Sequence, residues 1–229
     1  MELLRNRLKW TDLHSWEVSP EEAVQIQMKL RDKMSLHNGF DKIERIAGAD
    51  VGYSKDMAIG GVVVMEFPGL AMIEEAFSHL PVKFPYLPGL LAFREGPPLL
   101  EAFKKIKSKV DLILFDGQGI AHPRRIGIAV HLGLWLDRAT IGCAKSRLVG
   151  QYSPPQARNG SLELLKDEEK VVGAVVRTKD KVRPIFVSPG HKINLDTSIE
   201  IVLKCASGSR VPEPLRKAHL LVNKLREGI

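Results

Sequence analysis

The chain has 229 residues, 44% of them hydrophobic and 27% charged, which is typical of a globular protein with a substantial core. It has no apolar run long enough to cross a bilayer, no secretory signal at its N-terminus, and only two cysteines, too few for a disulfide scaffold or a cysteine-rich zinc site. We therefore expect a cytoplasmic protein without membrane contact, and the formal net charge of +7 favours polyanionic partners.

The first predicted element is a helix over residues 19–34. Ser19 is a good N-cap, Pro20 suits the first helical position, and Glu22 completes a capping box. Apolar side chains recur at helical spacing along the segment, which predicts packing on the main sheet.

Three strands are predicted next, over residues 44–54, 58–67 and 70–80. Their short connections favour an antiparallel meander. Asp50 stands inside the first strand, where a carboxylate is unusual and costly to bury without a partner. Asp50 therefore either reaches solvent at a strand end or binds a cation.

A stiff loop follows the meander. Pro85 and Pro88 fix the backbone around Tyr86 and Leu87, which leaves an aromatic and an aliphatic side chain at the tip. The alternative is a loop whose tip faces the core.

A short helix is predicted over residues 90–95, broken by the Gly-Pro-Pro sequence at 96–98, with the helical stripe resuming at Leu99. Arg94 and Glu95 lie in the first part of this segment. Without other information, the pair is most simply interpreted as two solvated side chains.

The most informative stretch is LILFDGQGIAHPRR, residues 112–125. It begins with a fully apolar run, as expected for a strand covered on both faces, and Asp116 follows at the carboxyl end, where open α/β sheets place their ligand sites. The glycines after it allow close approach, and His122 and Arg124 add groups that bind anions. The combination indicates metal-assisted chemistry on a phosphate. The alternative is an aspartate that caps the next helix beside ordinary surface arginines.

The remaining elements alternate between strands and helices. His131 in the first of these helices is interpreted as structural, and His219 borders an apolar stripe as an interhelical histidine would. Lys145 stands at a strand end, where it would supply a point charge to a phosphate; the alternative is an ordinary exposed lysine. The predicted elements are a helix at 126–136, a strand at 139–148, a loop at 151–161, a hairpin of 170–178 with 183–191, and helices at 194–206 and 211–228. No repeat or linker divides the chain, so we expect a single domain over 1–229 with residues 1–18 as an N-terminal tail.

Three antiparallel strands, a helix, a buried strand, a helix and another buried strand form an order that resembles the ribonuclease H-like α/β fold. Nucleases of that fold gather acids from the first strand, the first helix and the fourth strand, where this chain has Asp50, Glu95 and Asp116. Magnesium prefers oxygen ligands and keeps several waters, so two or three carboxylates suffice to hold it.

Longer motifs narrow the resemblance to one family. IAGADVGY, FPYLPGLLAFREGP, FDGQGIAHPRRIGIA and IGCAKSRLVG stand in this order at 46–53, 84–97, 115–129 and 141–150, followed by RPIFVSPGH at 183–191 and VPEPLRKAH at 211–219. Together they closely resemble the endonuclease V family of deoxyinosine 3′ endonucleases, from about Ser19 onward. Only the N-terminal tail and residues 151–169 look unconstrained.

The resemblance implies a role for each matching residue. Asp50, Asp116 and Glu95 would hold Mg²⁺, for which Mn²⁺ can substitute, and Lys145 would contact the cleaved phosphate, with His122 and His219 nearby. Tyr86 would be a wedge that separates the strands, presented by Pro85, Leu87 and Pro88. Gly89, Leu91, Gly117 and Ile128 would hold an extruded base, largely through backbone groups, and Arg94, Arg124 and Ser146 are candidates for further substrate contacts.

The implied function is a monomeric, metal-dependent repair endonuclease that recognises inosine in nucleic acid. It would hydrolyse the second phosphodiester bond 3′ to the lesion, leaving 3′-hydroxyl and 5′-phosphate ends. Whether DNA or RNA is the substrate stays open. The alternatives are another nuclease of this fold, cutting junctions or RNA–DNA hybrids, and a non-catalytic binder of damaged nucleic acid.

Overall fold

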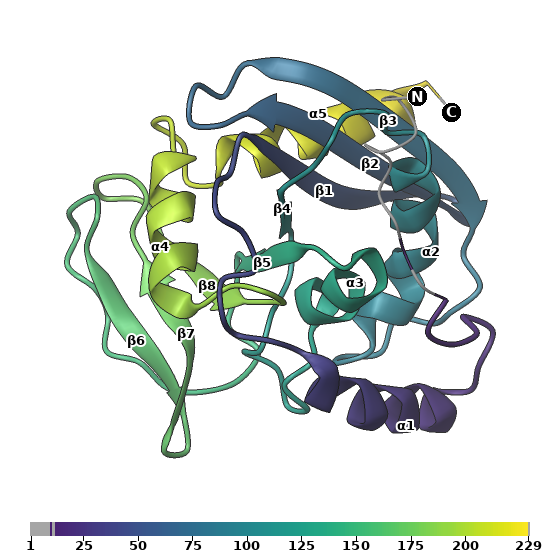
Figure 1. The fold of residues 1–229 in the computed structure, drawn as a ribbon, viewed down its shortest axis with the longest axis horizontal. Coiled ribbons are helices and arrows are strands. Elements are labelled where there is room, and N and C mark those ends of the chain that lie inside the picture. Colours follow the sequence, from purple (N-terminus) through teal and green to yellow (C-terminus); the bar gives the residue numbers. More distant parts are fainter. Residues whose placement is uncertain (1–9, 11, 229) are drawn as a thin grey trace.

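The computed structural model describes residue 10 and residues 12–228; residues 1–9, 11 and 229, including that part of the expected tail, lie outside the described residues. One mixed eight-stranded sheet, in the order β3-β2-β1-β4-β5-β8-β7-β6, is flanked by helices (Figure 1). The elements are α1 Pro20–Leu30, the 3-10 turn η2 Arg31–Lys33, β1 Arg45–Ser54, β2 Met57–Glu66, β3 Met72–Pro81, α2 Leu91–Phe103, β4 Leu112–Phe115, α3 Ile128–Leu136, β5 Ala139–Ala144, β6 Leu162–Asp167, β7 Lys170–Val176, β8 Ile185–Pro189, α4 Leu195–Lys204 and α5 Glu213–Glu227. This confirms the predicted α/β class.

The sheet has a parallel centre between two antiparallel parts. β1, β2 and β3 form the predicted meander, and β4 and β5 continue from β1 as parallel strands. β8 then pairs antiparallel with β5, and β7 pairs antiparallel with β8, which confirms the predicted hairpin. The carboxyl ends of β1, β4 and β5 consequently meet at one edge of the sheet.

Both faces of the central strands are covered, as the apolar sequence of β4 predicts. Ile113 and Phe115 belong to a core cluster with α2 and α3, whereas Leu112 and Leu114 belong to a second cluster with residues of α4 and α5. The alternation follows from the two-residue period of a strand. The capping box predicted at Ser19 also forms, since its side chain accepts from Glu22 N and the Glu22 side chain accepts from Ser19 N.

The predicted break at residues 96–98 is wrong, because α2 continues through both prolines as one helix. Tertiary contacts hold the segment: a Cβ on Gly96 would lie 2.7 Å from the Trp16 ring, and Ser78 Oγ donates to Pro98 O at 2.6 Å. These contacts offset the cost of interior prolines. Glu95 and Phe103 therefore lie on one continuous helix.

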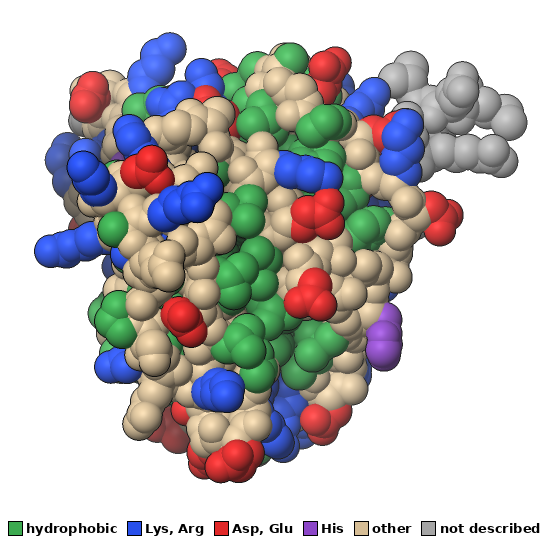
Figure 2. All heavy atoms as spheres, turned by 90° about the vertical axis from the view of Figure 1, so that its left-hand side faces the viewer, with side chains coloured by type: hydrophobic (Ala, Val, Ile, Leu, Met, Phe, Trp, Pro, Cys, Tyr) green, Lys and Arg blue, Asp and Glu red, His purple; other side chains and the backbone are tan. Residues whose placement is uncertain are grey.

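β6 lies within residues 151–169, where no strand was predicted, and it pairs antiparallel with β7. β6 is an edge strand in which Leu162 and Leu164 are exposed and Leu165 is buried. Hydrophobic and polar residues therefore do not alternate along β6 as they do in a strand with one buried face. Figure 2 shows hydrophobic side chains on the side of the molecule that carries β6, β7 and α4, with charged groups around them.

The described part of the N-terminal segment packs on the helices. His14 Nε2 lies 2.6 Å from Nε2 of the fully buried His131, and Trp16 stacks on the same ring with centroids 5.3 Å apart. His131 is thus a structural histidine, as predicted. None of the helices in the described residues is long and apolar enough to cross a membrane.

Candidate active site

Two acids meet where β1 and β4 run side by side. Ala49 pairs with Phe115 in the parallel register, so Asp50 and Asp116 follow on adjacent strands, and Asp116 N donates to Ala49 O at 3.4 Å. Asp50 is buried, with 9% of its surface exposed. Burial and the charge of Asp116 raise the pKa of Asp50, while the hydrogen bond from His219 opposes that shift.

Glu95 on α2 is the third acid, and with Asp50 and Asp116 it forms what we call the acidic cluster. Burial is the largest influence and raises the pKa of Glu95 to about 8; the negative charges of Asp50 and Asp116 act in the same direction. The predicted solvated Arg94–Glu95 pair is therefore wrong. Tyr53 Oη donates to Glu95 Oε1 at 3.1 Å, and the Arg94 guanidinium lies 4.6 Å from the Tyr53 ring centroid.

Two basic side chains lie against the acidic cluster. Lys145, directly after β5, forms an ion pair with Asp116, and His219 on α5 donates from Nδ1 to Asp50 Oδ2 at 2.8 Å. Asn223, one turn further along α5, donates to His219 Nε2 at 2.9 Å, which fixes the proton on Nδ1. His219 therefore faces the sheet, and its interpretation as an interhelical histidine is wrong.

The approach of α5 to the sheet depends on a glycine in β1. A Cβ on Gly48 would lie 2.1 Å from Pro214 O, so any larger residue would push the start of α5 away. α5 carries His219, and the close contact at Gly48 thus sets the distance between this imidazole and Asp50.

The donor set of the acidic cluster suits a hard divalent cation. Besides burial, the charge of Asp116 raises the pKa of Asp50, and the charges of Asp50 and Asp116 raise the pKa of Glu95. Carboxylate oxygens are the ligands that Mg²⁺ prefers. Among the described residues, no group of three or more His, Cys, Asp or Glu side chains is already arranged as a complete metal site. Lys145 and His219 occupy carboxylate oxygens that a cation would take.

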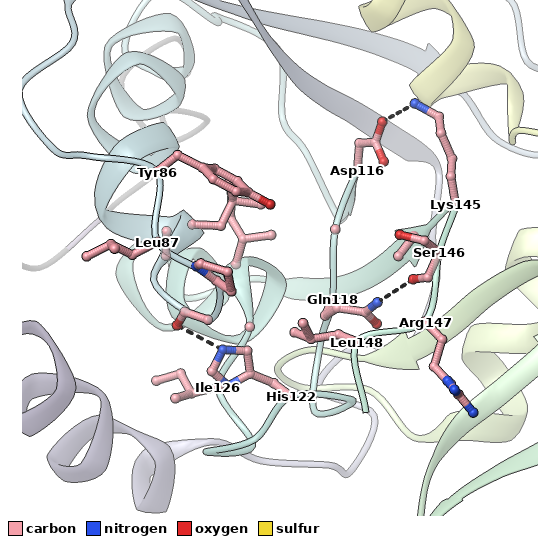
Figure 3. Close-up of a pocket in the computed structure, with 18 of the residues that line it drawn as sticks. Tyr86, Leu87, Asp116, Gln118, His122, Ile126, Lys145, Ser146, Arg147 and Leu148 are labelled. Atoms are coloured by element: carbon pink, nitrogen blue, oxygen red, sulfur yellow. Dashed lines mark hydrogen bonds and ion pairs between the residues drawn. The ribbon is translucent and has the colours of Figure 1, made fainter. Parts of the chain in front are cut away.

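A pocket of about 340 Å³ lies beside the acidic cluster and shares Asp116 and Lys145 with it. We call it the apolar pocket, because Leu87, Leu91 and Ile128 contribute much of its wall. In Figure 3, Tyr86 stands on one side of this hollow and Asp116 with Lys145 on the other. Its volume is within the range of small-molecule sites.

One carbonyl group organises the loop that forms the wall below Tyr86. Gly89 O accepts from His122 Nε2 at 2.9 Å, Arg124 Nη2 at 2.7 Å and Gln27 Nε2 at 3.0 Å. Gly89 has φ 82°, a left-handed conformation that favours glycine, and a Cβ there would lie 2.9 Å from the Arg124 guanidinium. The loop is therefore held rigidly at its base.

His122 is part of this support and lies away from the acidic cluster. Its Nδ1 accepts from Arg124 N at 3.2 Å, so its Nε2 carries the proton given to Gly89 O. Burial is the largest influence on His122; together with the charges of Arg124 and Arg125, and against the opposing effect of the Gly89 carbonyl, it lowers the pKa of His122 to about 4. His122 is neutral at physiological pH.

Tyr86 has 69% of its surface exposed, although it stands on an anchored loop. The exposed ring excludes a Tyr86 that faces the core, whereas Leu87 is partly buried against the core cluster that contains Phe84, Leu90 and Phe93.

The structure brings most of the predicted residues to one of two places. Asp50, Glu95, Asp116, Lys145 and His219 meet at the acidic cluster. Tyr86, Leu87, Pro88, Gly89, Leu91, Gly117, His122, Ile128 and Ser146 line the apolar pocket, as do Asp116 and Lys145. Pro85, Arg94 and Arg124 do not line it; Arg94 donates to Phe84 O and Arg124 supports Gly89 from behind.

Several residues of the apolar pocket and the acidic cluster were not identified from the sequence. Gln118 and Gln27 line the apolar pocket, and Gln118 Nε2 donates to Ser146 O at 3.0 Å. Gln118 lies inside the quoted GQG motif, so its position was a usable signal. Tyr53 likewise ends the motif IAGADVGY at 46–53. Gln27 and Asn223 gave no signal, because their roles arise from contacts with distant segments.

Comparisons with known proteins agree with the geometry. The family model described as Endonuclease V matches residues 28–220. A curated Endonuclease V of Methanothrix thermoacetophila is 50% identical over 214 residues, covering 93% of this chain and 95% of that protein. One from Dictyoglomus thermophilum is 48% identical, covering 89% and 90%.

Solved structures similar to this chain are also Endonuclease V proteins. Endonuclease V of Bacillus subtilis has a TM-score of 0.91 at 32% identity, covering 96% of this chain and 97% of its own. A variant of Ciona intestinalis Endonuclease V, with TM-score 0.81 and 30% identity over 92% of this chain and 99% of its own, was solved with a 23mer DNA containing an inosine followed by a ribo-adenosine. This chain therefore belongs to the Endonuclease V family and is an endonuclease that hydrolyses phosphodiester bonds.

Proposed function

We propose that this endonuclease recognises inosine in nucleic acid and hydrolyses the second phosphodiester bond 3′ to it, leaving 3′-hydroxyl and 5′-phosphate ends. The observation that carries the proposal is the shared wall: Asp116 and Lys145 belong to the acidic cluster and also line a pocket large enough for a base. A base held in that pocket keeps its own strand beside the acids.

Recognition would take place in the apolar pocket. Deamination of adenine replaces an amino donor with a carbonyl acceptor and weakens pairing with thymine, so the lesion costs less to extrude than a normal base. Tyr86 would fill the gap that the base leaves, since its ring is exposed and its loop is anchored at Gly89. The pocket could reject guanine, whose extra amine would be left without a partner.

The acidic cluster would supply the chemistry. Asp50, Asp116 and Glu95 would hold magnesium or manganese, which when bound readies a water for attack and stabilises the leaving oxygen. Lys145 would release Asp116 and offer its ammonium group to the phosphate. His219 would orient Asp50 through Nδ1, and Tyr53 would orient Glu95 through its hydroxyl.

The test is single-turnover cleavage of matched DNA and RNA oligonucleotides, each with one inosine, adenine or guanine at the same position. We expect cleavage of the inosine substrates alone, in magnesium or manganese, and none with a chelator. Fragment lengths and end chemistry give the position of the cut. Equal cleavage of the adenine control would contradict the recognition step. Inosine binding without any cleavage would favour a non-catalytic binder.

A further inference from the structure

A second hollow lies across the loop of residues 145–148 from the apolar pocket. It has a volume of about 670 Å³ and is lined by Lys145, Arg147, Tyr152, Arg183 and Arg210, together with Ser146, Phe186 and two prolines. We call it the basic groove. It shares Lys145 with the acidic cluster, so the cluster stands where the two hollows meet.

The basic groove holds positive charge that the protein does not balance. Among the described residues that line it there is no aspartate or glutamate. Arg147 and Arg183 are exposed, and neither forms an ion pair with any acid in the described part of the chain. Arg147 also lines the apolar pocket, and Figure 3 shows its side chain directed away from Tyr86. Cationic side chains gathered in a cavity attract an anion.

The wall between the two hollows is fixed from both sides. On the pocket side, Gln118 Nε2 donates to Ser146 O at 3.0 Å. On the groove side, Arg210 Nη2 donates to Lys145 O at 2.8 Å and to Pro184 O at 3.0 Å. The two hollows therefore keep a constant relation to each other and to Lys145.

An aromatic pair supports Arg147. Tyr152 packs against Phe186 with ring centroids 5.4 Å apart, and the Arg147 guanidinium lies 5.9 Å from the Tyr152 ring centroid. A guanidinium held over a ring keeps its donors free for a phosphate, and a planar cation beside a ring is also a surface on which bases stack. Both features suit a nucleic-acid strand better than a small inorganic anion.

We propose that the basic groove binds the phosphodiester backbone of the cleaved strand on the 3′ side of the cleaved bond. This rests on the proposed function, in which the extruded base occupies the apolar pocket and the cut falls 3′ to it. The strand then passes from the pocket to the acidic cluster, and its continuation meets the groove on the far side of Lys145. Arg147 and Arg183 contact its phosphates, while Arg210 supports the wall.

The experiment compares the wild type with an Arg147→Ala/Arg183→Ala variant. Binding is measured by fluorescence anisotropy in a chelator, and cleavage by single turnover in magnesium. The single-stranded inosine oligonucleotides are full length, truncated on the 5′ side of the inosine, or truncated to end one nucleotide beyond the cleaved bond. The matched control is Lys42→Ala/Lys107→Ala, which removes two charges near the amino ends of β1 and β4, at the other edge of the sheet.

On the full-length and 5′-truncated substrates, we expect the groove variant to bind about tenfold more weakly, with a salt slope lower by about 1.4 for two lost phosphate contacts. On the 3′-truncated substrate, we expect it to match the wild type. A loss that persists on the 3′-truncated substrate, or one that the control reproduces, would overturn the assignment. Unchanged melting temperatures exclude misfolding. Wild-type cleavage of the full-length substrate reports on the proposed function separately.

Discussion

The apolar pocket and the acidic cluster share Asp116 and Lys145, but they are built in opposite ways. In the pocket, hydrogen bonds satisfy a neutral imidazole and hold the loop of Gly89 in place. In the cluster, burial and neighbouring negative charge raise the pKa values of Asp50 and Glu95, and at Asp50 the basic side chains of His219 and Lys145 oppose this only in part. One region is already stable without a ligand, and the other is arranged to gain from one. A substitution can therefore disrupt the apolar pocket without the acidic cluster, or the acidic cluster without the apolar pocket.

Asp116→Asn should impair the acidic cluster and leave the apolar pocket intact, and its effect should be the largest of those predicted here. Removing this carboxylate should lower single-turnover cleavage by about a thousandfold, since several kcal/mol of charge stabilisation depend on a bound cation. Binding of an inosine oligonucleotide should stay equal or become tighter, because one negative charge facing phosphate is lost. The measurements are cleavage in magnesium and anisotropy in a chelator. Wild-type cleavage rates in this variant would refute the assignment of the metal site.

Lys145→Ala removes a charge from the boundary between the two regions. We expect the cleavage rate at saturating enzyme to fall by about a hundredfold, as for the loss of one group that stabilises charge in a transition state. Affinity should change little, since one phosphate contact among many adds little to binding. Single-turnover rates across a range of enzyme concentrations separate the two effects. An unchanged maximal rate would show that Lys145 only neutralises Asp116.

His122→Gln tests the pocket side through stability. The pKa of His122 lies at about 4, below the unfolded value of 6.5, so the unfolded state binds more protons. The contribution of the neutral His122 to the free energy of unfolding is fully present above pH 6.5 and is lost as the pH falls towards 4. Between pH 7.5 and 5 the wild type should lose about 2 kcal/mol through this group alone.

Denaturant unfolding at both pH values, for wild type and His122→Gln, gives the difference directly. The variant should be less stable at pH 7.5 but should lose less on acidification. Equal losses in the two proteins would mean that His122 is not held neutral.

Tyr86→Ala should have the smallest effect and the most selective one. A ring that is 69% exposed contributes little to folding, so the melting temperature should barely change. Cleavage of inosine inside a duplex should fall by about tenfold, the worth of one stacked base, whereas cleavage in a single strand should change much less. Pro88→Gly should weaken the same discrimination. Equal losses on both substrates with a large drop in melting temperature would make Tyr86 a packing residue.

The sequence predicted the parts of the site that depend on strand ends. Asp116 and Lys145 follow buried apolar strands, and parallel strands bring their carboxyl ends together. The continuous α2 could not be predicted, because Trp16 and Ser78 contacts with distant residues decide it. β6 was missed because an exposed edge strand has no buried alternation. The position of His122 depended on the Gly89 carbonyl, 33 residues away.

The contact between His219 and Asp50 joins residues 169 positions apart, and it has a consequence for how the enzyme matures. Synthesis runs from the N-terminus, so β1, α2 and β4 can assemble the three acids long before α5 exists. During that interval Asp50 lacks its imidazole partner and Gly48 lacks the helix that packs on it. A nascent chain on the ribosome thus carries the acids in an unfinished setting. Docking of α5 completes it, so the site reaches the arrangement described above only after residues 213–227 have been synthesised.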